Sequence, residues 1–154
     1  MHSGLQAELK QTRPFRSPLE EAFVSLQRTA AVLEHALETA LRPTGITATQ
    51  YNVLRILRGA GDDGLCRSEI GERMVRRVPD VTRLLDRLED TGHIARTRAG
   101  DDRRFVTTRI TPSGRDVLTS LDEVVATYLA SSMGRLAPEQ LHALNEILAT
   151  LRQT

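Results

Sequence analysis

Arginine side chains are concentrated in the middle of this sequence. Of its 21 lysine and arginine residues, only Lys10 is lysine. Between residues 67 and 109 the arginines are Arg67, Arg73, Arg76, Arg77, Arg83, Arg87, Arg96, Arg98, Arg103, Arg104 and Arg109. Guanidinium groups bond phosphate oxygens and guanine edges through paired donors. Acidic residues lie between these arginines, so the pattern indicates a local patch and not a basic tail. A GC-rich genome would also explain arginine in place of lysine, but not the clustering.

The other reactive side chains predict neither an enzyme nor a metal site. The four histidines are His2, His35, His93 and His142, and they lack the spacing of metal ligands. The sequence has no G-x-S-x-G, no Walker loop and no dinucleotide glycine pattern. The single cysteine, Cys66, excludes a disulfide framework, and a redox role for it competes with an incidental one. We therefore expect no catalytic residue and no cofactor.

Length and composition are those of one ordinary globular chain. It has 154 residues, 40% of them hydrophobic and 27% charged, with a net charge of +1. No stretch approaches the roughly 18 uncharged apolar residues of a membrane span. Residues 1–17 lack the apolar segment of a secretory signal and read as a flexible, disordered arm. We expect a cytoplasmic protein that does not enter a membrane.

Helical spacing of apolar residues predicts six helices. They cover residues 18–41, a segment from 47 to 59–61, 67 to about 75, 79–92, and two segments that open at Pro112 and Pro138. Thr47 with Gln50, and Cys66 with Glu69, have the spacing of capping boxes. Pro79 is expected at a first helical position, and Val75 on the inner side of its helix.

Between the fourth and fifth helices the period changes from 3.6 to 2. Residues 93–98 and 104–110 read as two strands, joined by a turn at 99–102. The fold class is therefore mainly α with a small β-hairpin wing. Residues 47–111 form a winged helix-turn-helix, while residues 18–42 and 112–154 form long amphipathic helices. These leave broad apolar stripes uncovered, which a second copy of the chain would cover.

In a helix-turn-helix the second helix presents its N-terminal part to the major groove. That geometry puts Asp80, Thr82 and Arg83 near base edges and Arg76 and Arg77 along phosphates. The full predicted DNA-binding set is Arg67, Ser68, Arg76, Arg77, Pro79, Asp80, Thr82, Arg83, Arg87, Asp102, Arg103 and Arg104. The alternative is a solvated charged face. Against it, the i to i+4 pairs Arg83–Arg87 and Asp86–Asp90 carry like charges, which is unfavourable on an isolated helix.

Residues 101–104, Asp-Asp-Arg-Arg, form the tip of the predicted hairpin. Asp102 and Arg104 lie two positions apart, on the same side of an extended strand, so the carboxylate could hold the guanidinium in position. Arginines at such a tip suit phosphate or the narrow minor groove. The alternative is an ordinary charged turn.

Residues 69–114 resemble the signature region of the MarR family. The matching elements are VTRLLDRLEDTG, R-T-R, D-x-R at residues 102–104 and I-T-x-x-G at residues 110–114. The resemblance implies that Arg104 enters the minor groove while Asp102 holds it, and that the first and last helices build a triangular dimer. It also implies a cleft for a small aromatic or phenolic anion, with Arg55 meeting the anion and His35 and Tyr51 orienting it. Core packing with a surface arginine is the competing interpretation of these three.

The function expected from this resemblance is that of a homodimeric transcriptional regulator on a pseudo-palindromic operator in double-stranded DNA. Repression by occlusion of a promoter, relieved by a small effector, is the expected mode. The alternative is a winged-helix module for protein–protein contact, or an anti-regulator, that has lost DNA binding.

Overall fold

The computed structural model describes residues 4–98 and 106–153. The predicted turn at 99–102 and the predicted site residues Asp102, Arg103 and Arg104 therefore lie outside the described residues. Contacts divide the chain into two units, Met1–Thr39 and Ala40–Thr154. Each unit is described by itself.

The first unit consists of the short helix α1 (Gly4–Glu8) and most of the long helix α2 (Pro18–Leu41). Helix α2 begins at Pro18 as expected, where the Ser17 hydroxyl accepts a hydrogen bond from the Glu20 backbone N–H at 3.2 Å. The prediction of a disordered arm is wrong at Gly4–Glu8. An ion pair between Arg28 Nε and Glu8 Oε1, 3.1 Å apart, joins α1 to α2. No local sequence pattern predicts this contact.

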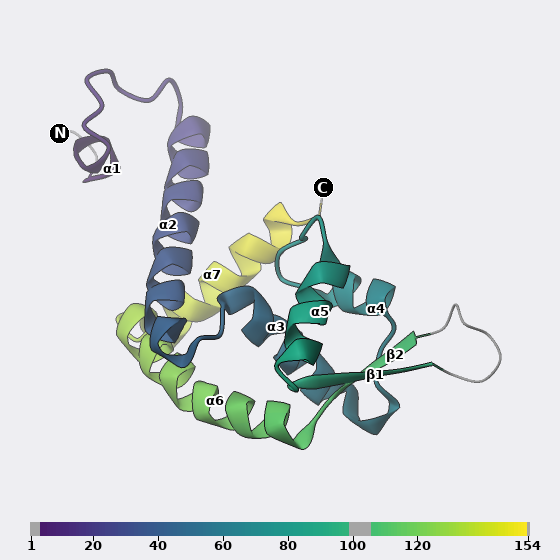
Figure 1. Cartoon of the computed structure of the whole chain (residues 1–154). Coiled ribbons are helices and arrows are strands. Elements are labelled where there is room, and N and C mark those ends of the chain that lie inside the picture. Colours follow the sequence, from purple (N-terminus) through teal and green to yellow (C-terminus); the bar gives the residue numbers. More distant parts are fainter. Residues whose placement is uncertain (1–3, 99–105, 154) are drawn as a thin grey trace. The chain divides into compact units, whose positions relative to one another are not determined.

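The second unit contains the predicted winged helix-turn-helix and the C-terminal helices (Figure 1). Its elements are η1 (Arg42–Thr44), α3 (Ala48–Ala60), η2 (Gly61–Asp63), α4 (Arg67–Arg73), α5 (Val81–Asp90), β1 (Ile94–Arg98), β2 (Val106–Ile110), α6 (Pro112–Ser132) and α7 (Pro138–Leu151). The core of this unit is aliphatic and includes Leu41, Val53, Leu54, Leu57, Ile70, Leu85, Leu88, Ile94, Leu118 and Leu121. Helix α6 packs on α3, and α3, α4 and α5 gather at the base of the hairpin.

Side-chain caps fix where the helices begin. Thr47 Oγ1 accepts from the Gln50 N–H at 3.1 Å, and Gln50 Oε1 accepts in return from the Thr47 N–H at 3.0 Å. Glu69 Oε2 accepts from the Cys66 N–H at 2.8 Å, and this bond lowers the pKa of the Glu69 carboxyl. Both predicted capping boxes are confirmed.

Two predicted helix ends are wrong. Helix α4 ends at Arg73, the following Met74 is extended, and Val75 is 91% exposed instead of facing inward. Helix α5 begins at Val81 and not at Pro79, because Asp80 is its N-cap and accepts from the Arg83 N–H at 2.9 Å. An aspartate N-cap satisfies a backbone donor of the first turn, which a proline at the start of a helix does not.

The hairpin is a regular antiparallel pair. Its register runs from Ile94 opposite Ile110 to Arg98 opposite Val106. Strand β1 begins one residue later than predicted. Leu65 adds a bridge on the other side of β2, giving its N–H to the Thr108 carbonyl at 3.0 Å and accepting from the Thr108 N–H at 2.8 Å. The base of the hairpin is thereby bonded to the segment between η2 and α4.

The I-T-x-x-G pattern has a structural explanation at the start of α6. Thr111 Oγ1 accepts from the Gly114 N–H at 3.0 Å and donates to the Gly92 carbonyl at 2.6 Å. An added Cβ at Gly114 would lie 2.1 Å from the His93 carbonyl oxygen. The end of β2, the start of α6 and the link after α5 therefore meet at a joint that only glycine fits.

We expect Gly114→Ala to lower the free energy of unfolding by about 1–3 kcal/mol, because a backbone carbonyl must move to admit the new methyl group. Chemical denaturation monitored by circular dichroism measures the change. Gly71→Ala is the control, since its Cβ would have only an ordinary contact, 3.6 Å from Val81 Cγ2, and alanine favours a helix. Equal stability of the Gly114→Ala variant and the parent would contradict this explanation of the joint.

Candidate nucleic-acid interface

Helices α4 and α5 and the turn between them form the helix-turn-helix of the second unit. Leu85 and Leu88 of α5 are buried, whereas Thr82, Arg83 and Arg87 are exposed on its outer side. This division follows the 3.6-residue period, which keeps positions 85 and 88 on the opposite side from 83 and 87. The outer side of α5 therefore carries the residues that the sequence predicted for DNA.

The guanidinium groups on this side are available to a partner. Within the described residues, no hydrogen bond or ion pair involves the side chain of Arg83 or Arg87. Arg67 of α4 donates from Nη1 to Thr82 Oγ1 at 3.1 Å, which joins the two helices across the turn. Because the Thr82 hydroxyl accepts this bond, its own hydrogen remains free to donate.

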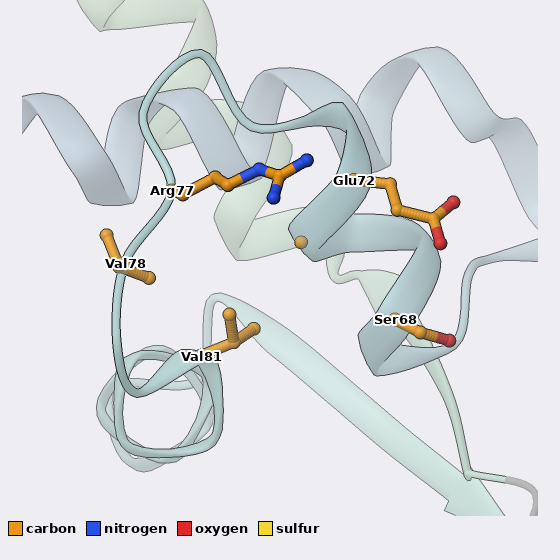
Figure 2. Close-up of a pocket in the computed structure, with 6 residues that line it drawn as sticks. Ser68, Glu72, Arg77, Val78 and Val81 are labelled. Atoms are coloured by element: carbon orange, nitrogen blue, oxygen red, sulfur yellow. The ribbon is translucent and has the colours of Figure 1, made fainter.

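A hollow of about 380 Å³ lies between α4 and the start of α5 (Figure 2). Ser68, Gly71, Glu72, Arg77, Val78 and Val81 line it. Ser68 and Arg77 are predicted DNA-binding residues that the fold brings together here. Glu72, which the sequence analysis did not single out, also lines the hollow. Glu72 opposes phosphate binding at this place, so the hollow is not a simple anion site.

Two acidic residues of α5 have structural roles. The Asp80 carboxylate caps the helix, as described above. Asp86 does not simply point to solvent, because Arg96 of β1 donates from Nη2 to Asp86 Oδ1 at 2.6 Å and to Glu89 Oε2 at 2.5 Å. The like-charge pair Asp86–Asp90 is therefore compensated by a partner from the hairpin, which spacing along the helix could not reveal.

Arg109, one of the clustered arginines, is directed to the base of the hairpin. It donates from Nε to the Asp62 carbonyl oxygen at 2.6 Å and from Nη1 to Thr97 Oγ1 at 2.9 Å. Arg115 of α6 lies 3.6 Å from the Asp62 carboxylate. By contrast, Arg98 at the outer end of β1 is exposed. An exposed guanidinium such as that of Arg98 can bond a phosphate, whereas Arg109 holds the hairpin in place.

Residues predicted to bind an effector fall in both units. Tyr51 is buried in the second unit, and the guanidinium carbon of Arg55 lies 5.8 Å from the centre of its ring. Burial raises the pKa of the Tyr51 phenol, and the charge of Arg55 opposes that rise only in part. One helical turn further along α3, Arg58 pairs with Asp122 of α6 through bonds of 2.5 and 3.2 Å. His35 lies on α2, is exposed, and belongs to the first unit.

The described part of the chain also bears on Cys66, on metal binding and on membrane spans. The Cys66 sulfur lies 3.0 Å from Ser68 Oγ at the start of α4. Among residues 4–98 and 106–153, no three histidine, cysteine or acidic side chains form a group that could hold a metal ion. No helix in the same ranges combines the length and the apolar character that crossing a membrane requires.

The sequence of this chain is similar to those of known transcriptional regulators. The MarR family model matches residues 46–106. The transcriptional repressor MdtR of Bacillus subtilis is 32% identical over 134 residues, which cover 84% of this chain and 83% of MdtR. The uncharacterized transcriptional regulator YfiV of the same organism is 34% identical over 66% of this chain, which spans 62% of the length of YfiV.

Several solved structures are similar to the structure of this chain. A MarR transcription factor from Planctomyces limnophilus is 34% identical, with a TM-score of 0.69 over 88% of this chain and 98% of that one. A DNA complex of MepR from S. aureus (21% identity, TM-score 0.75, 83% and 93% covered) shares the fold. So does BpsR of Bordetella bronchiseptica, whose DNA binding is regulated by 6-hydroxynicotinic acid (22% identity, TM-score 0.78, 87% and 100% covered). With a relative more than 30% identical over most of both chains, this chain belongs to the MarR family of DNA-binding transcriptional regulators, which are not enzymes.

Proposed function

We propose that this chain is a sequence-specific repressor that binds a pseudo-palindromic operator as a homodimer. The observation that carries the proposal is the outer side of α5, where Thr82, Arg83 and Arg87 are exposed while the leucines behind them are buried. Arginine bonds guanine O6 and N7 in pairs, and a threonine hydroxyl with a free hydrogen donates to base acceptors. The name of MdtR, a repressor, supports the direction of regulation.

Some residues of this surface would position the protein on the DNA backbone, and others would recognise bases. Arg76 and Arg77 in the turn, together with Ser68 of α4, would bond phosphates at the surface around the hollow, which fixes the register of α5 on the duplex. Arg67 would hold Thr82 in place through their hydrogen bond. Two subunits would present two copies of α5 to major grooves about 34 Å apart. The roles of Asp102, Arg103 and Arg104 stay predictions, since these residues lie outside the described ranges.

Exposed apolar side chains support the homodimer, because their contact with water is unfavourable. The exposed large ones on α2, α6 and α7 are Leu19, Phe23, Leu26, Val32, Leu129, Ile147 and Leu151. Phe23 is 61% exposed and Ile147 is 59% exposed. A second copy of the chain would remove these surfaces from water.

An effector would bind near Tyr51 and Arg55. The buried phenol keeps its proton at neutral pH and can donate a hydrogen bond, while the exposed guanidinium of Arg55 can pair with a carboxylate or phenolate. The regulation of BpsR by 6-hydroxynicotinic acid supports an aromatic anion as the class of ligand. Participation of His35, and a cytoplasmic location of the protein, stay predictions of the sequence.

A module that binds only another protein is the second candidate, and selection of duplexes from a random pool separates the two. At near-physiological salt we expect enrichment of an inverted repeat with half-sites one helical turn apart. Arg83→Ala should weaken binding to that repeat by about 1–3 kcal/mol and relax the preference at one position of each half-site. Arg135→Ala, an exposed arginine between α6 and α7, is the control. A folded dimer that enriches nothing would favour the protein-binding module.

Substitutions can separate the capping role of Asp80 from its predicted role in base recognition. Asp80→Ala should cost about 1 kcal/mol of stability, because the Arg83 N–H loses its acceptor, while Asp80→Asn keeps an acceptor and should cost less. If Asp80 also reads a base, Asp80→Asn should change the selected half-site at one position, with a smaller loss of stability than Asp80→Ala. Thermal unfolding and duplex selection on both variants measure these effects. Parental stability of Asp80→Ala would refute the capping role.

Substitutions in α7 test the proposed homodimer. Ile147→Glu places a charge in a surface that we expect to be buried between subunits, so the dissociation constant of the dimer should rise at least about tenfold. Sedimentation velocity across a concentration series measures it. Asn145→Glu adds the same charge to an exposed position of the same helix and serves as the control. A parent that is monomeric at micromolar concentration would contradict the homodimer.

A further inference from the structure

Arg96 connects the hairpin to the helix that faces DNA. It lies in the middle of β1 and donates from Nε to Glu89 Oε2 at 2.8 Å and from Nη2 to Glu89 and Asp86 at 2.5 and 2.6 Å. The backbone N–H of Arg96 also donates to Glu89 Oε1 at 3.1 Å. One residue of β1 thus satisfies two carboxylates on successive turns of α5. We call these three side chains, Arg96, Asp86 and Glu89, the latch.

The latch lies where apolar packing between β1 and α5 ends. Side chains two apart on a strand share a face, so Ile94, Arg96 and Arg98 follow one another along the same side of β1. Ile94 is buried in the core, Arg96 is half-buried against α5, and Arg98 is exposed. The latch therefore links the outer part of the strand to α5 through side chains.

The charges of the latch are compensated within the protein. Arg96 carries one positive charge and meets two carboxylates, so it has little left to offer a phosphate. Its side chain is 24% exposed, less than that of Asp86 or Glu89. The bond with Arg96 lowers the pKa of the Glu89 carboxyl, so the pair stays charged from neutral pH well into the acid range. A planar guanidinium makes these divergent bonds, and a lysine ammonium does not reproduce them.

We propose that Arg96 is a positioning residue for DNA recognition: through the latch it fixes the orientation of the hairpin relative to α5, so that Arg98 and Arg83 contact the same duplex together. This inference rests on the proposed function. It assigns specificity to a residue that does not itself contact DNA. Small errors in such an orientation are costly, because paired contacts to bases and phosphates tolerate little displacement.

The test compares the parent with Arg96→Lys, Arg96→Gln and the double variant Asp86→Asn/Glu89→Gln on the duplex that the parent selects and on a scrambled duplex, at several salt concentrations. The two arginine variants should bind the selected duplex at least about tenfold more weakly, because Arg98 and Arg83 no longer contact it together. All latch variants should lose discrimination between the duplexes. Arg135→Gln controls for the loss of a positive charge, and thermal unfolding identifies the variants that remain folded; if Arg96→Gln unfolds, Arg96→Lys and the double variant carry the test.

The double variant separates positioning from simple charge. It removes two negative charges near the DNA, so electrostatics alone would tighten binding to both duplexes equally and preserve discrimination, whereas loss of the latch reduces discrimination. A salt slope that falls by about one in Arg96→Gln with discrimination intact would overturn the inference, because Arg96 would then be a phosphate contact. Parental binding by folded latch variants would also overturn it while leaving the proposed function standing. A parent that selects no duplex would contradict both.

Discussion

The proposed DNA interface depends first on burial of the leucine side of α5. Leu85 and Leu88 are removed from water, and each contributes about 1.5–3 kcal/mol by that burial. Rotating the helix to present another side would expose them. The direction of Arg83 and Arg87 is therefore set by packing behind them and not by contacts of their own. A helix held in this way fixes the backbone positions of its exposed arginines before a partner arrives, which reduces the entropy lost on binding.

Polar contacts at three places extend this rigidity to the hairpin. Thr111 and Gly114 join the end of β2 to the link after α5, Arg109 ties the hairpin to the Asp62 carbonyl, and Leu65 pairs with Thr108 on β2. Arg96 then connects β1 directly to α5. Much of the basic character of the central sequence is consequently used inside the protein. The arginines divide into those that build the interface and those that are exposed on it, and net charge does not distinguish the two groups.

The order of elements, the capping boxes and the inner leucines could be predicted from sequence, because each depends on local spacing. The beginning of α5 was misplaced because Pro79 and Asp80 both signal a helix start, and the side-chain cap of Asp80 decides between them. Pairs between residues far apart in the sequence could not be predicted from local spacing: Glu8 of α1 pairs with Arg28 of α2, and Arg96 of β1 pairs with Asp86 of α5. The place of Glu72 in the lining of the hollow could not be predicted, since only the fold brings Glu72 and Arg77 to the same hollow.

Hydrogen–deuterium exchange of the full chain with and without its selected duplex shows whether the outer side of α5 contacts DNA. We expect slower amide exchange on binding in residues 74–88, which contain the turn and the exposed arginines, with the C-terminal half of α7 unchanged. Unchanged exchange throughout residues 74–88, together with protection on another surface, would contradict it.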